Sequence, residues 1–173
     1  HNNGQITVGS GSVGMRAENG NVYNRATGKI ESTGENAIGM SQSGNSGEIE
    51  NHGNINLVGD KSIGMHSEGA TNAGHTMLNK GNVTVGDSTR ADSPSIGIYS
   101  NNGLNSTIRN EGKVQAGARS TGIYGRNVTL TSSSETTAGD GGIGVYSKEG
   151  TVNIEQNAKI SVGKSLGASQ EGA

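Results

Sequence analysis

The sequence contains no cysteine, phenylalanine or tryptophan, and it has a single proline. Without cysteine, the chain can form neither disulfide bonds nor thiolate metal sites. Only 28% of its 173 residues are hydrophobic, a proportion that favours disorder in chains that are also rich in proline and net charge. This chain is rich in neither, because its net charge is only −2. We therefore expect a folded chain whose few apolar residues are placed at regular intervals.

Charge and hydropathy give no support for binding to nucleic acid or to a membrane. A net charge of −2 and a pI near 6.1 provide no basic surface for phosphate groups or anionic lipids. No apolar run approaches the roughly 18 residues that span a bilayer. The first residues also lack the features of a secretory signal. We expect no nucleic-acid partner and no direct membrane insertion by this chain.

Glycine is abundant instead, with 31 residues, and some of these recur in a fixed setting. Each of the recurring glycines, which we call the anchor glycines, lies between two mostly apolar residues. The triplets are Val13-Gly14-Met15, Ile38-Gly39-Met40, Ile63-Gly64-Met65, Ile96-Gly97-Ile98, Thr121-Gly122-Ile123, Ile143-Gly144-Val145 and Leu166-Gly167-Ala168. Successive anchor glycines are 25, 25, 33, 25, 22 and 23 residues apart. A period of this size predicts a solenoid in which each repeat is one coil.

Two further apolar series run in step with the anchor glycines. In the first, apolar residues lie two positions apart and a glycine usually follows: Ile6/Val8, Ile55/Leu57, Val83/Val85, Val114/Ala116 and Ile160/Val162, with weaker copies at Ile30/Ser32 and Thr136/Ala138. The second series precedes the first in each coil and consists of Val22, Ile49, Met77, Ile108, Leu130 and Ile154. Spacing by two residues predicts β-strands, because a helix repeats at about 3.6 residues.

The three series predict an all-β fold, a three-sided parallel β-helix with three short strands in each coil of 22–25 residues. We expect about six to seven coils, a single segment over residues 1–173 and a rod on the order of 30 Å long. Right-handed winding is expected because parallel crossovers are right-handed in about 98% of cases. The apolar residues should fill a narrow interior, with Ile38, Ile63 and Ile96 in one column.

An amide residue follows most members of the second apolar series at a distance of two residues, which places it on the inward side of the strand. Stacked amides can hydrogen-bond from coil to coil, so we predict a buried ladder. Its members are Asn24, Asn51, Asn79, Asn110 and Gln156, with Asn2 in the first coil and Ser132 as a weaker copy.

Aromatic residues occupy the outward position after the anchor triplets in consecutive coils. The resulting column consists of His66, Tyr99, Tyr124 and Tyr146. One interpretation is a structural ladder, since aromatic side chains stacked at strand spacing help to set the register. The other is a contact strip, since tyrosine is enriched at protein interfaces.

Two segments lengthen the coils in which they lie. Residues 67–74 should lengthen one corner, and residues 87–95 contain the only proline. Loops on a rigid scaffold commonly carry function, so the second segment is a candidate contact loop. Its candidate residues are Asp87, Arg90, Asp92 and Pro94. The alternative is that the surface simply tolerates an insertion here.

No sequence motif predicts catalysis, a cofactor or a metal. Residues 9–14 and 139–144 match GxGxxG, but no helical pattern follows either of them, as a dinucleotide site requires. The four histidines form no HExxH motif. Some β-helices cleave polysaccharides, which requires acidic residues gathered on one face, and here the carboxylates are scattered. We therefore predict a protein that is not an enzyme.

The combined repeat resembles those of autotransporter passenger domains (type V secretion), especially of large fusobacterial adhesins. MLNKGNVTVG at residues 77–86 and IRNEGKVQAG at 108–117 show its first part most plainly. SIGIY at 95–99 and GIGVY at 142–146 show its second part. The resemblance covers essentially the whole chain, but it concerns a style of repeat and supplies no binding residues.

This resemblance implies a right-handed β-helical rod on a bacterial surface, tethered to the outer membrane by a C-terminal barrel that this sequence does not contain. Because the chain begins and ends within a coil, we expect a fragment of a longer passenger. The expected function is attachment to a protein or glycan on host cells or other bacteria, or to a second copy. The alternatives are a structural spacer and a carbohydrate-active β-helix.

Overall fold

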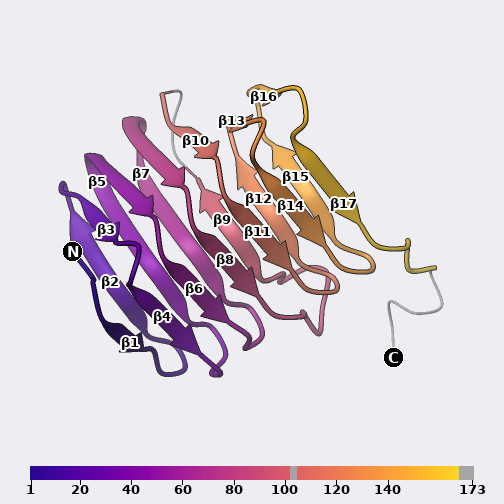
Figure 1. Cartoon of the computed structure of the whole chain (residues 1–173), viewed down its shortest axis with the longest axis horizontal. Coiled ribbons are helices and arrows are strands. Elements are labelled where there is room, and N and C mark those ends of the chain that lie inside the picture. The colour runs from indigo at the N-terminus through magenta and orange to yellow at the C-terminus, as the bar shows by residue number, and fades with distance from the viewer. Residues whose placement is uncertain (102–104, 168–173) are drawn as a thin grey trace.

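A computed structural model of the chain describes residues 1–101 and 105–167, and of residues 70–73 the backbone alone. Every regular element in this part of the chain is a β-strand, and all strand pairs are parallel. Equivalent strands of successive coils lie side by side along a rod, with β1 at one end and β17 at the other (Figure 1). The predicted all-β parallel β-helix is confirmed. No helix that could span a membrane occurs among the described residues.

One side of the rod is a sheet that we call the short-strand sheet. In spatial order its strands are β1 (Gln5–Thr7), β4 (Lys29–Ser32), β6 (Asn54–Leu57), β8 (Asn82–Val85), β11 (Lys113–Ala116), β14 (Glu135–Ala138) and β17 (Lys159–Val162). Their register aligns Ile30 with Ile55, and Val83 with Val114. This sheet is the first apolar series of the sequence, and its alternate residues point into the rod and out of it.

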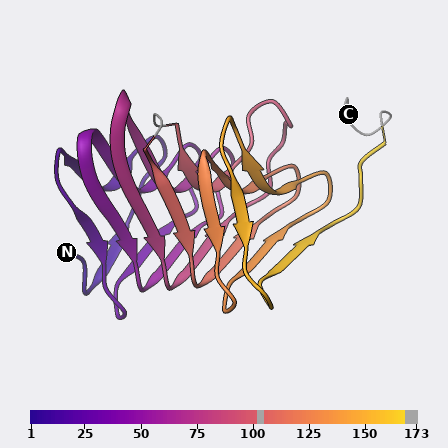
Figure 2. The same cartoon turned by 90° about the horizontal axis from the view of Figure 1, so that it is seen from above.

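The anchor-glycine strands and the strands of the second series form one larger sheet, the long-strand sheet. The anchor strands are β2 (Val13–Glu18), β5 (Ile38–Asn51), β7 (Ile63–Asn79), β9 (Ile96–Ser100), β12 (Thr121–Gly125) and β15 (Ile143–Ser147). The others are β3 (Val22–Asn24), β10 (Thr107–Asn110), β13 (Asn127–Leu130) and β16 (Val152–Ile154), and β5 and β7 extend through both sets. The strands of each coil follow one another around the rod (Figure 2).

As predicted, the segment 67–74 lengthens its coil: β5 has one residue between the paired positions Gly44 and Ser46, whereas β7 has four between their partners Gly69 and Gly74. β7 runs unbroken through this segment and pairs with β5, with one register shift between Gly44 and Ser46. Gly44 and Gly47 adopt φ values of 101° and 145°, which side chains disfavour, so β5 can bend there without ending. The additional residues of β7 therefore lie at this register shift, between Gly69 and Gly74.

The core is a narrow column of aliphatic side chains that runs through the rod. Met40, Met65 and Ile98, the last residues of their triplets, are fully buried in it. The expectation that Ile38, Ile63 and Ile96 fill the interior is wrong, although they do lie in register above one another. Each is only half-buried and lies outside the core cluster. Next to each of them, successive anchor glycines approach one another so closely that no side chain fits between them.

The last triplet of the sequence forms no coil in the described part of the chain. Leu166 and Gly167 lie outside any strand, and Ala168 lies outside the described residues. The last strand of the short-strand sheet, β17, ends at Val162, and this sheet has seven strands within the described ranges.

Candidate contact surfaces

The interior of the rod contains a ladder of amides, as predicted. The Nδ2 atoms of Asn2, Asn24, Asn51 and Asn79 each donate to the Oδ1 atom of the next member, at 2.8, 2.8, 2.9 and 2.8 Å. Asn24, Asn51, Asn79 and Asn110 have no exposed surface. The ladder satisfies buried donors and acceptors along the axis, so its role is structural.

The placement of Gln156 in this ladder is wrong, because Gln156 is exposed. Leu130 occupies the position above Asn110, and Ile154 follows it. The Asn110 amide instead donates to Thr136 Oγ1 at 3.4 Å.

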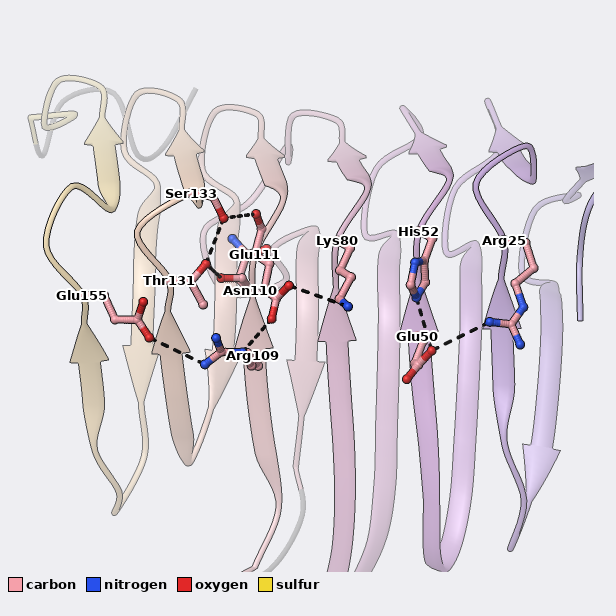
Figure 3. A network of polar contacts seen from close by, with 10 residues as sticks. All are labelled: Arg25, Glu50, His52, Lys80, Arg109, Asn110, Glu111, Thr131, Ser133 and Glu155. Atoms are coloured by element: carbon pink, nitrogen blue, oxygen red, sulfur yellow. Dashed lines mark hydrogen bonds and ion pairs between the residues drawn. The ribbon is translucent and has the colours of Figure 1, made fainter.

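The shift arises at the corner after β13, which is two residues longer than its predecessor. Thr131 Oγ1 donates to the carbonyl of Asn110 at 3.2 Å, and Ser133 Oγ donates to that of Glu111 at 2.8 Å (Figure 3). Ser132 is exposed there and joins no ladder. Val128, rather than Leu130, pairs with Ile108. The member of the second apolar series in this coil is therefore Val128, two residues earlier than the sequence suggested.

The predicted aromatic column exists, and we call it the aromatic column throughout. Its rings are stacked on β7, β9, β12 and β15, with centroid separations of 5.5 Å for His66–Tyr99, 5.1 Å for Tyr99–Tyr124 and 5.0 Å for Tyr124–Tyr146. Tyr99 and Tyr124 are half-buried, whereas Tyr146 is 43% exposed. Because the rings cover each other's faces, the column presents ring edges and hydroxyl groups to solvent.

Two members of the aromatic column, His66 and Tyr99, are kept uncharged at neutral pH by burial. Burial lowers the pKa of His66 below its ordinary value of 6.5, although Glu68 opposes the shift. Burial and the neighbouring Tyr124 raise the pKa of Tyr99 above 10.0. An uncharged strip loses less hydration when it is covered than a charged one, so these shifts suit a contact surface.

An apolar column that we did not predict flanks the aromatic one, three residues earlier on the same strands. Its members are Val13, Ile38, Ile63, Ile96 and Ile143, with the buried Thr121 in the fifth place. Val13 is 38% exposed and Ile143 46% exposed. The two columns together make the outer face of the anchor strands amphipathic. The signal was present in the anchor triplets, whose first residues we had placed in the core.

Acidification is expected to destabilise the rod through two histidines. His75 is buried with its Nδ1 atom 2.6 Å from Ser67 Oγ, and burial lowers its pKa from 6.5 despite a raising contribution from the Gly44 backbone. Burial lowers the pKa of His66 in the same way. Below pH 6.5 the unfolded chain therefore binds more protons than the folded one, and stability that is present above this pH is lost as the pH falls.

The melting temperature, followed by circular dichroism, should consequently fall between pH about 7.5 and about 5. A variant carrying His66→Gln and His75→Gln should lose less over the same interval than the unmodified chain. An equal loss in both proteins would show that other groups are responsible.

The segment 87–95 leaves the sheets as a loop, as predicted, but its charged groups are largely engaged. Asp87 Oδ1 accepts a hydrogen bond from the Ala118 backbone at 2.7 Å. Arg90 Nε and Nη2 donate to the two carboxylate oxygens of Asp92 at 2.9 and 2.7 Å, and this pairing lowers the pKa of Asp92. Pro94 is half-buried. Arg90 and Asp92 thus remain exposed as a self-paired tip.

A line of charged residues runs along the corners of the long-strand sheet. It consists of Arg25, Glu50, His52, Lys80, Arg109, Glu111 and Glu155 (Figure 3). Arg109 is 2.7 Å from Glu111 and 3.6 Å from Glu155, while Lys80 is 3.9 Å from Glu111. Exposed pairs of this kind contribute about 0–1 kcal/mol each. The opposite charges neutralise one another, so this line fits a structural role better than a binding site.

No arrangement in the described ranges fits metal binding: they contain no group of three or more His, Cys, Asp or Glu residues that could hold an ion. No model of a protein family matches the chain, and searches of curated proteins and of solved structures returned no match.

Proposed function

We propose that this chain is the non-enzymatic rod of a bacterial surface adhesin, a fragment of an autotransporter passenger. In this proposal the outer face of the anchor strands is its contact surface. The partner is a protein or glycan on a host cell or another bacterium, or a second copy. The chain is held at the cell surface through an outer-membrane barrel elsewhere in the parent protein. The repeat pattern supports the family, and the two exposed columns support the contact surface.

The observation that carries the proposal is the joint exposure of aromatic and apolar columns on one rigid face. Tyr146 and Ile143 are 43% and 46% exposed on β15, the end strand of the long-strand sheet. On the inner strands the members of both columns, such as Tyr124 and Ile63, are half-buried and so still reach the surface. Aromatic residues concentrate binding energy because they bury much surface with little loss of conformational entropy. A purely structural spacer is the second candidate, and the mutual stacking of the rings favours it.

Binding of the labelled protein to bacterial and epithelial cells tests this proposal by flow cytometry. The variant with Tyr99→Ala, Tyr124→Ala and Tyr146→Ala should bind at least about tenfold more weakly, since truncated aromatic hot spots commonly cost more than a factor of ten. A matched variant with Thr76→Ala, Thr107→Ala and Asn153→Ala changes exposed residues outside the column and should bind normally.

The outcomes separate the two candidates. Undiminished binding by a folded tyrosine variant would remove the aromatic column from the contact surface. Failure of the unmodified chain to bind any cell, or itself, would favour the spacer. Circular dichroism of each variant shows whether its fold is retained.

A further inference from the structure

The outer face of the short-strand sheet carries an open trough of about 550 Å³. It extends over β4, β6, β8 and β11, with the Ile55 backbone in its floor. Its walls are Lys29, Glu31, Asn54, Asn56, Asn82, Thr84, Lys113 and Gln115. These residues lie on the opposite side of the sheet from the buried Ile55, Val83 and Val114. The trough therefore runs across the strands, along the axis of the rod.

Two rows of polar side chains form the walls. The strand register aligns Lys29, Asn54, Asn82 and Lys113 in one row, and Glu31, Asn56, Thr84 and Gln115 in the other. Asn82 Nδ2 donates to Asn54 Oδ1 at 2.8 Å. This bond uses one donor and one acceptor lone pair, so each amide keeps further hydrogen-bonding capacity toward solvent.

A second, smaller trough of about 340 Å³ lies beside the first and shares Thr84 and Gln115 with it. Gly117 and Gly139 line its far side. A Cβ atom at Gly139 would lie 2.6 Å from the Ala118 nitrogen, so no side chain fits on this side of the trough. The shared row is thus a polar ridge between two parallel depressions.

Several kinds of partner fit this surface poorly. Interior strands of the sheet are hydrogen-bonded on both edges, so no peptide strand can be added to this face. Nucleic acid requires many cations, whereas Lys29 and Lys113 are accompanied by Glu31 and the chain carries a net charge of −2. An apolar protein surface would leave the wall amides without partners, at a cost in free energy.

We propose that this trough binds a linear, uncharged polysaccharide lying along the rod, with its hydroxyl groups bonded to the amides of Asn54, Asn56 and Asn82. Amide groups both donate and accept, as hydroxyl groups do. Within each row the side chains repeat about every 4.8 Å along the axis, so an extended polymer meets new partners at each strand. Many weak contacts on one chain then add up to useful avidity. The site extends the proposed adhesive function to a glycan ligand, on a face separate from the aromatic column.

Affinity electrophoresis in native gels that contain hydroxyethyl cellulose, galactomannan or dextran tests this inference. At least one of these neutral polymers should retard the unmodified chain. The variant with Asn54→Ala and Asn82→Ala should be retarded at least about tenfold more weakly, because several hydrogen bonds are lost. Asn153→Ala is the matched control, an exposed amide outside the trough, and should behave like the unmodified chain.

Three results would overturn the inference: no retardation by any neutral polymer, equal retardation of the trough variant, or retardation by alginate alone that salt abolishes. The triple tyrosine variant should keep its retardation in these gels. Loss of cell binding in that variant with retained glycan binding would separate the two surfaces, so either proposal can fail without the other.

Discussion

Replacement of Gly39 by alanine is expected to lower the free energy of unfolding by about 3 kcal/mol, the upper range for overpacking a core. A Cβ atom at this position would lie 2.7 Å from the carbonyl oxygen of Gly64 and 2.9 Å from Ile55 Cγ2. A backbone carbonyl of the next coil cannot rotate away as a side chain can. The two coils must therefore separate, which weakens their strand pairing as well as their packing.

Thermal unfolding followed by circular dichroism measures this effect, which corresponds to a loss of about 6–12 °C in melting temperature. Gly144→Ala is a matched control, because its Cβ would meet only the side chains of Ile160 and Val162, at 2.7 and 3.2 Å. We expect a smaller loss there. Gly9→Ala, with its nearest neighbour Ser12 Oγ at 3.8 Å, should be almost neutral. Equal melting temperatures for all three variants would show that the coils tolerate side chains at the anchor positions.

This close approach explains why the anchor glycines were the clearest feature of the sequence. Each anchor Cβ from Gly14 to Gly122 would collide with the carbonyl of the next anchor glycine along the rod. The repeated requirement comes from stacking, so its period equals the length of a coil. Period-two alternation then identified the strands of the short-strand sheet, because one side of each strand is buried.

The errors arose where local pattern and coil geometry diverge. Ile38 belongs to an apolar triplet, but Met40 rather than Ile38 enters the core. Gln156 was wrongly placed in the ladder because Val128 and Leu130, which lie two positions apart, are both apolar and both compatible with the interior. Only the length of the following corner distinguishes them, and apolar spacing does not report corner length.

The candidate surfaces were predictable to different degrees. The aromatic column followed from a constant offset after each anchor glycine, so sequence register alone placed Tyr99 above His66. The trough could not be found in this way, because it depends on the space between two rows of side chains. Asn54 and Glu31 are ordinary surface residues until the pairing of β4 with β6 aligns Asn54 with Lys29 and Glu31 with Asn56.

Replacement of Asn79 by leucine is expected to cost about 2–6 kcal/mol, because two buried amides lose their ladder partner at about 1–3 kcal/mol each. Asn51 Nδ2 donates to Asn79 Oδ1 at 2.9 Å, and Asn79 Nδ2 donates to Asn110 Oδ1 at 2.8 Å. The leucine side chain fulfils neither role, and water cannot reach these fully buried groups. The melting temperature should fall by roughly 2–4 °C for each kcal/mol lost.

Two comparisons show whether the ladder acts as a connected unit. Asn2→Leu removes the end of the ladder, which is 8% exposed and has one ladder neighbour, Asn24, and it should cost less than Asn79→Leu. The double variant Asn79→Leu/Asn110→Leu should cost less than the sum of its single changes, because no amide is then left between them without a partner. Additive losses would mean that each asparagine is stabilised by its own corner carbonyls, and an unchanged melting temperature in Asn79→Leu would mean that the ladder contributes no stability.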